Sequence, residues 1–276
     1  SRSWSSQACR ADEQMQSESR DEWLVAESLT ALGFQVTRVP TGRKRSCDFT
    51  VSDSQSRYLV EVKGRTDPNE LWTTLQQDET YESGRDLCRS NRIQDVVDGA
   101  MKQLTETRRT RFAEFMLTAL VVRPVLSRDA EFRRVMATLY GTQELLEFGA
   151  DFKSRTTYTC LYFDESSFFR HEELNAALVF VGSEKWTLCV NDFASNAAEF
   201  RKSQMYRQFI KARAIFDPAS ATRDQGYLVA DFDVSRSDRG SMQREICRRY
   251  GLQNVIPFNP IEWTGAVAIP KVGNRT

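Results

Sequence analysis

Three charged residues interrupt two short apolar segments near the start of the chain. Asp48 lies in CDFTV, residues 47–51, and Glu61 and Lys63 lie in YLVEVKG, residues 58–64. Both segments are rich in β-branched and aromatic residues, and the turn-forming residues SDSQS stand between them, so they are predicted to be adjacent strands. Because side chains alternate along a strand, Glu61 and Lys63 share one face, and Asp48 can reach that face from the neighbouring strand.

This arrangement of charges indicates a site for a hard divalent cation. Two carboxylates a few ångströms apart repel each other, and each raises the pKa of the other. An ion such as Mg²⁺ or Mn²⁺ prefers oxygen ligands and removes that repulsion. It also polarises a phosphoryl oxygen and acidifies a bound water, while an adjacent ammonium offsets negative charge that develops on phosphorus. The pattern therefore predicts metal-assisted chemistry on a phosphate at Asp48, Glu61 and Lys63.

The segments around these residues resemble a known group of nucleases. They are, in order, the helical pattern DEWLVAESLTALGF, then CDFTV, then the Glu-Val-Lys of YLVEVKG, and then an amphipathic pattern over residues 92–106. This order resembles the PD-(D/E)xK nuclease superfamily, and within it the Mrr-like and archaeal Holliday-junction-resolvase-like nucleases. The resemblance covers residues 21–123 and nothing after residue 125. It departs from the family at Cys47, where a proline often precedes the aspartate.

The resemblance implies a restriction-endonuclease-like core made of a helix, three strands, a helix and a strand. In such a core Asp48, Glu61 and the backbone carbonyl of Val62 would bind the metal ion. Lys63 would assist the attacking water.

The resemblance also implies a further carboxylate on the first helix, where two residues compete. Glu22, eleven residues before Gly33, is favoured. Glu27 is the alternative, and it lies roughly 140° around the helix from Glu22.

Other polar residues are candidates because of their position beside this site. Gln103, on the amphipathic helix after the strands, could face the site as a supporting residue, or could lie on the surface. The basic loop GRKR contains Arg43, Lys44 and Arg45 and would border the site, so we expect it to contact nucleic-acid phosphates. Taken alone, such a cluster is more often a solvated surface.

The whole pattern predicts an α/β protein with an additional C-terminal α/β region. A polar N-terminal tail is expected over residues 1–20 and the nuclease-like core over 21–125. Within the core, residues 64–91 are expected to be a loop-rich insertion with turns at TDPNE and ESGRD and a short helix near 71–75. Residues 126–276 are expected to be an extension of the core or a second domain. In that region strands are predicted at TYTCLYF, AALVFVG, KWTLCV, GYLVADFDV, NVIPF and GAVAI, and helices at DAEFRRVMATLYG, AAEFRKSQMYRQFIKARAIF and SMQREICRRYG.

Composition narrows the class of protein further. The formal net charge is zero, so the basic clusters are local features of the surface. No apolar run is long enough to span a bilayer, and the N-terminal residues have no apolar signal core, so we expect a cytoplasmic protein without a membrane partner. The six scattered cysteines are expected to be free thiols, and a single histidine, His171, argues against a zinc finger and is expected at the surface.

The expected function is metal-dependent hydrolysis of phosphodiester bonds in nucleic acid, DNA rather than RNA, in defence or repair. Two alternatives stay open: a catalytically idle nucleic-acid-binding subunit, or a component of a larger nuclease complex that binds a protein partner through its C-terminal region. A homodimer is expected, because duplex cleavage by this kind of core generally needs two sites.

Overall fold

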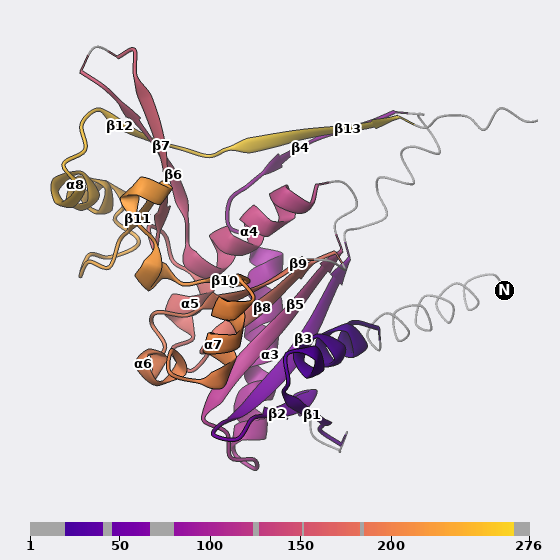
Figure 1. Cartoon of the computed structure of the whole chain (residues 1–276). Coiled ribbons are helices and arrows are strands. Elements are labelled where there is room, and N and C mark those ends of the chain that lie inside the picture. The colour runs from indigo at the N-terminus through magenta and orange to yellow at the C-terminus, as the bar shows by residue number, and fades with distance from the viewer. Residues whose placement is uncertain are drawn as a thin grey trace, which may run out of the picture.

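A computed structural model describes residues 20–40, 46–66, 80–123, 127–150, 152–182 and 185–267. The chain is a mixed α/β protein with two mixed sheets and a separate two-stranded ribbon (Figure 1). The expected N-terminal tail, apart from residue 20, and the expected helix near 71–75 lie outside the described residues.

The larger sheet has seven strands and carries the candidate site. Its order is β1 (Gln35–Arg38), β2 (Phe49–Ser52), β3 (Arg57–Thr66), β5 (Phe115–Arg123), β8 (Ala176–Val181), β9 (Lys185–Val190) and β10 (Ile215–Phe216). The first three strands form an antiparallel meander, whereas β3, β5 and β8 run parallel. Strand β9 is antiparallel to β8 and parallel to β10. Strands from the C-terminal half of the chain therefore complete the sheet that begins in the N-terminal half.

Helices cover both faces of this sheet, because the strands present apolar side chains to both of its faces. Leu59 packs with α3 (Asn91–Arg108) and α4 (Arg128–Tyr140), whereas Tyr58 and Val60 pack with the helix over residues 20–31. The short helices α6 (Ala197–Phe200) and α7 (Gln204–Lys211) lie on that second face, and α5 (Ser167–Arg170) lies on the first. The result is a three-layer arrangement in which a sheet buried on both sides fixes the site residues in place.

The second sheet has four strands, in the order β11 (Tyr227–Val229), β7 (Arg155–Leu161), β6 (Gln143–Phe148) and β12 (Val255–Phe258). Helix α8 (Arg239–Tyr250) packs on it through the buried Met242 and Ile246. Two 3₁₀ turns, Pro218–Ser220 and Arg223–Gln225, precede β11. Strands β4 (Thr80–Asp86) and β13 (Ile261–Val267) form an antiparallel ribbon that runs across the top of Figure 1.

The predicted order of a helix, three strands, a helix and a strand is confirmed over residues 20–123, with β4 as an addition. The first helix ends at Gly33, whose φ of 88° lies in the left-handed region that glycine tolerates. Strands were also correctly predicted at β7, β8, β9, β12 and β13, and helices at α4 and α8.

Three predictions of local structure are wrong, and one strand was missed. The turn expected at ESGRD is part of β4, because pairing with the distant β13 outweighs its turn-forming residues. The single helix expected at AAEFRKSQMYRQFIKARAIF is α6, α7 and β10, and it breaks where the Ser203 hydroxyl accepts a hydrogen bond from the Tyr206 backbone N–H and caps α7. GYLVADFDV forms only the short β11. Strand β6 was not predicted.

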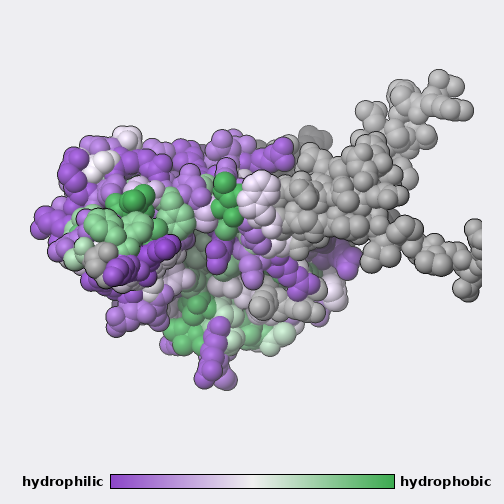
Figure 2. Space-filling view, turned by 90° about the horizontal axis from the view of Figure 1, so that it is seen from above, coloured by the Kyte–Doolittle hydropathy of each residue, from purple (hydrophilic) through white to green (hydrophobic). Residues whose placement is uncertain are grey.

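The face of the molecule drawn in Figure 2 is largely hydrophilic, with separate apolar patches. None of the helices in the described ranges is long and apolar enough to span a membrane.

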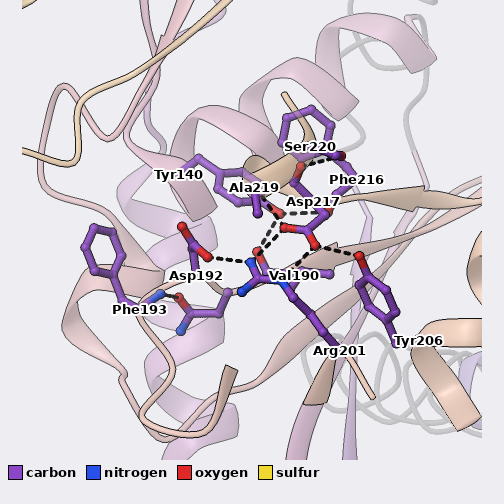
Figure 3. Close-up of polar contacts among 11 residues, drawn as sticks. Tyr140, Val190, Asp192, Phe193, Arg201, Tyr206, Phe216, Asp217, Ala219 and Ser220 are labelled. Carbon is purple, nitrogen blue, oxygen red and sulfur yellow. Dashed lines mark hydrogen bonds and ion pairs between the residues drawn. The ribbon is translucent and has the colours of Figure 1, made fainter. Parts of the chain in front are cut away.

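A partly buried ion cluster holds the segments that follow β9 and β10. Figure 3 shows the Arg201 guanidinium between two carboxylates, those of Asp192 and Asp217. Arg201 donates from Nε and Nη2 to the two oxygens of Asp217, at 2.9 and 2.8 Å. The Tyr206 hydroxyl and the Ala219 backbone N–H also donate to Asp217, at 2.8 and 3.0 Å. These bonds lower the pKa of Asp217 against the opposing effect of its burial, so the carboxylate is stabilised in its charged form.

Replacing Asp217 with asparagine should reduce the free energy of unfolding at pH 7 by about 2–3 kcal/mol, because it leaves Arg201 half-buried beside a single carboxylate. The folded-state pKa of Asp217 is lowered, so its contribution is present above the unfolded pKa of about 3.9 and is lost as the pH falls through the folded value. Urea unfolding at several pH values measures the difference from wild type, which should shrink in acid. Glu245→Gln, in the exposed pair with Arg248, is the control and should not change stability. A pH-independent loss in Asp217→Asn would contradict the electrostatic explanation.

Candidate functional site

The site lies where β3 continues past the end of β2. Strand β2 begins at Phe49, which is paired with Val60, so Asp48 stands next to Glu61 at the point where the pairing stops. The Val62 backbone N–H donates to Oδ2 of Asp48 at 2.7 Å. Because the N–H and C=O of one strand residue point toward the same edge, the Val62 carbonyl is directed to the side on which Asp48 lies.

Helix α3 supplies the polar partner of Lys63. The Lys63 ammonium donates to Oε1 of Glu61 and to Oε1 of Gln103, both at 2.5 Å. The Gln103 amide in turn donates to the backbone carbonyl of Ser46 at 3.3 Å. A second link between the same elements runs from the Cys47 backbone N–H to the Thr107 hydroxyl at 2.7 Å. The residues just before β2 are therefore fixed to α3.

These groups line a small, polar cavity of about 230 Å³. Its side chains come from the helix over residues 20–31, from β3 and the residues before β2, and from α3; they are Asp21, Glu22, Asp48, Glu61, Lys63 and Gln103. The strand residues Val62 and Gly64 complete the wall. The first helix contributes two adjacent carboxylates, each bound to an arginine: Asp21 to Arg123 and Glu22 to Arg38.

The Glu61 carboxylate is the most constrained group of the cavity. It is 1% exposed, and its Oε2 atom has no hydrogen-bond partner. Burial, together with repulsion from Asp48, raises the pKa of Glu61 to about 8 against the opposing effect of Lys63. Burial also raises the pKa of Asp48, and the hydrogen bond from Val62 limits that rise. The cavity thus holds two carboxylates whose charged forms are poorly compensated by the protein alone.

The structure brings together Asp48, Glu61, Val62, Lys63, Gln103 and Glu22, as the sequence predicts. Glu27 is exposed and does not line the cavity, so of the two predicted candidates on the first helix Glu22 is the one that reaches it, next to Asp21. Arg43, Lys44 and Arg45 lie outside the described residues.

Sequence reasoning missed Asp21 and Arg38. Asp21 stands four residues before Val25 and eight before Leu29, both fully buried, so it occupies the apolar stripe of the helix. That spacing could have identified it as a buried acid. Arg38 ends β1, and its charge lowers the pKa of Asp48; the sequence carried no signal for this contact.

The carboxylates of Asp48 and Glu61 and the Val62 carbonyl are hard oxygen donors, the kind that Mg²⁺ and Mn²⁺ prefer. In the described ranges, no three His, Cys, Asp or Glu side chains are grouped as metal ligands. This agrees with the pairing of Asp21 and Glu22 to arginines, which leaves two carboxylates and one backbone oxygen as the convergent donors.

His171 and the cysteines lie apart from this cavity. His171 is partly exposed and its Nε2 atom lies 2.7 Å from Oδ1 of Asp98, so the histidine predicted at the surface has a carboxylate partner there. The end of α5 packs beside α3 and brings His171 next to that carboxylate. The five described cysteines are free thiols, as expected.

Comparisons with known proteins add nothing to this geometry, because no family model, curated protein or solved structure matches the chain.

Glu61→Gln should stabilise the protein at pH 8 by roughly 1–2 kcal/mol in the presence of a chelator, because a neutral amide replaces a buried carboxylate and can still accept from Lys63. The folded-state pKa of Glu61 is raised. The stability that the wild-type protein gains from this carboxyl group is therefore fully present below the unfolded pKa of about 4.3 and is lost as the pH rises through the folded value. The gain should therefore be clearly smaller at pH 5 than at pH 8. Urea unfolding with EDTA at both pH values measures it, and Glu27→Gln is the exposed control. The stability difference between Glu61→Gln and wild type is compared at the two pH values. If the substitution is more destabilising at pH 8 than at pH 5, the ionised Glu61 carboxylate is well stabilised and the explanation is refuted.

Proposed function

We propose that this chain is a metal-dependent nuclease that hydrolyses phosphodiester bonds in nucleic acid, DNA in preference to RNA. Its core, over residues 20–123, would be restriction-endonuclease-like. The observation that carries the proposal is the Oε2 atom of Glu61, a buried carboxylate oxygen without a hydrogen-bond partner beside Asp48 and Lys63. The raised pKa of Glu61 shows that Lys63 alone stabilises the charged form incompletely, so a bound cation would stabilise it further, and such groups are concentrated at functional sites.

The donor set fits a divalent metal ion. Asp48, Glu61 and the Val62 carbonyl would hold Mg²⁺ or Mn²⁺ at the end of β2, and the small polar cavity leaves space for water. The ion would supply Lewis acidity toward a phosphoryl oxygen and a lower pKa for a bound water.

The protein's own groups would orient the substrate and stabilise charge. Lys63 has three N–H donors, of which Glu61 and Gln103 take two, so the third can bind a phosphate oxygen or the attacking water. Gln103 holds the ammonium beside the two carboxylates, and Glu22 lines the cavity from the first helix together with Asp21.

Asp48→Asn and Glu61→Gln should lower the rate of cleavage by about 10²–10³-fold or more, because each removes a metal-binding carboxylate. The measurement is cleavage of plasmid DNA, single-stranded DNA and RNA with Mg²⁺ and with Mn²⁺. Glu27→Gln is the matched control and should cleave like wild type, whereas Glu22→Gln should be impaired. Wild-type protein that binds nucleic acid and cuts none of these substrates would favour the idle-subunit alternative. Wild-type rates in both site variants would refute the site.

Lys63→Ala should preserve substrate binding and slow the cleavage step by roughly 10²–10³-fold, because the ammonium favours the more negative transition state over the substrate. Lys63→Arg should restore little activity, since a planar guanidinium cannot reproduce two short bonds from a compact ammonium. Single-turnover kinetics with a metal titration separates the two effects. The exposed Lys102 on α3 offers a control in Lys102→Ala. Near-normal cleavage in Lys63→Ala would remove the lysine from the mechanism.

A further inference from the structure

A second cavity, of about 420 Å³, lies between the four-stranded sheet and helix α4. Its volume is within the range of small-molecule sites, and it is larger than the cavity at Asp48 and Glu61. None of its lining residues belongs to the proposed nuclease site, so the inference drawn from it is independent of that function.

One row of side chains across the sheet forms a polar centre with an aromatic residue at each end. Tyr227 of β11 is paired with Thr159 of β7, Thr159 with Glu144 of β6, and Glu144 with Phe258 of β12. All four residues line the cavity. Strands lie about 4.8 Å apart, so Tyr227 and Phe258 stand roughly 14 Å from each other with the hydroxyl and the carboxylate between them.

The Glu144 carboxylate is held in place and still has capacity to accept hydrogen bonds. The Thr159 hydroxyl lies 2.9 and 3.1 Å from its two oxygens, but it carries a single hydrogen. A carboxylate accepts about four hydrogen bonds, so positions on both oxygens are open to N–H groups of a ligand. Burial raises the pKa of Glu144, as expected for a carboxylate that is partly withdrawn from solvent.

Arg133 of α4 provides the opposite charge at the same cavity. It is exposed, and its charge lowers the pKa of Glu144 and of Tyr227, so it lies near both. Phe132 of α4 and Phe216 of β10 add two more aromatic rings to the wall. The cavity therefore offers flat apolar surfaces, a fixed acceptor in its floor, and a cation that reaches solvent.

We propose that this cavity binds a nucleotide whose base carries an exocyclic amino group. The base would lie against the aromatic residues and donate N–H bonds to Glu144, and the phosphate would contact Arg133. Guanine presents two adjacent N–H groups to a carboxylate, and adenine and cytosine each present an amino group. Uracil has one N–H between two carbonyl oxygens, and these would face the Glu144 carboxylate unfavourably.

The test is calorimetric titration of the full chain with GMP, AMP, CMP and UMP. At least one amino-bearing nucleotide should bind, and UMP should bind about tenfold more weakly than the best of them or not at all. Failure of all four to bind, or tightest binding of UMP, would overturn the proposal. Competition by a single-stranded oligonucleotide distinguishes a nucleotide within nucleic acid from a free nucleotide.

Two variants separate the base contact from the phosphate contact. Glu144→Gln should weaken binding of the best nucleotide by roughly 10- to 100-fold. Arg133→Gln should weaken binding of the nucleotide and leave binding of the corresponding nucleoside, which has no phosphate, unchanged. Glu147→Gln, on the opposite face of β6, and the exposed Arg92→Gln on α3 are matched controls and should bind normally.

A chemical readout makes the test independent of variants that fold poorly. Cys88 is half-buried and lines the cavity, whereas the half-buried Cys247 on α8 does not. Bound nucleotide should slow alkylation of Cys88 in the wild-type protein, as measured by mass spectrometry of peptides, and leave Cys247 unaffected. Equal protection of both thiols, or protection of neither at saturating nucleotide, would refute binding at this cavity.

Discussion

A carboxylate buried inside a sheet is the constraint on which the candidate site depends. Glu61 is on β3, which is covered on both faces, and its Oε2 atom has no hydrogen-bond partner. Water would normally solvate such a group, so the surrounding elements must supply charge and donors in its place. Lys63 donates to the other Glu61 oxygen from the same strand, and Gln103 of α3 accepts from that ammonium and holds it in place. Asp48, held by the Val62 backbone N–H, adds a second negative charge beside Glu61.

The first helix is held against this site by an ion pair from a strand that is far away in the sequence. Asp21 is 2% exposed and is bound to Arg123 at the end of β5. Its carboxylate lies over Gly64 of β3, where a Cβ atom would stand only 2.0 Å from Oδ2 of Asp21. A glycine at that position lets the helix approach closely enough for the neighbouring Glu22 to line the cavity. The parallel pairing of β3 with β5 therefore also fixes the helix that precedes both strands.

Sequence alone predicted the parts of the site whose signals are local. Alternation along β3 placed Glu61 and Lys63 on one face, and the helical period of α3 indicated which of its residues are buried. Contacts between residues that are far apart in the sequence left no such local pattern. The ribbon of β4 and β13 joins segments about 180 residues apart, and ESGRD taken alone has the composition of a turn. Asp21 is an intermediate case, because its place on the apolar stripe was visible while its arginine partner was not.

The arrangement of strands also explains why β8, β9 and β10, from the second half of the chain, belong to the sheet that carries the candidate site. Strand β5 is buried on both faces, and its second edge is paired with β8 from Leu117 to Val122. A chain that ended near residue 125 would expose that long apolar edge, which is a template for aggregation. The Tyr140 hydroxyl, at the end of α4, lies 3.0 and 3.4 Å from the carbonyl oxygens of Val190 and Phe216 and shares its single hydrogen between them, which ties the helix to β9 and β10. The proposed catalytic residues thus lie in the first half of the chain, while the sheet that keeps them rigid requires strands from the second.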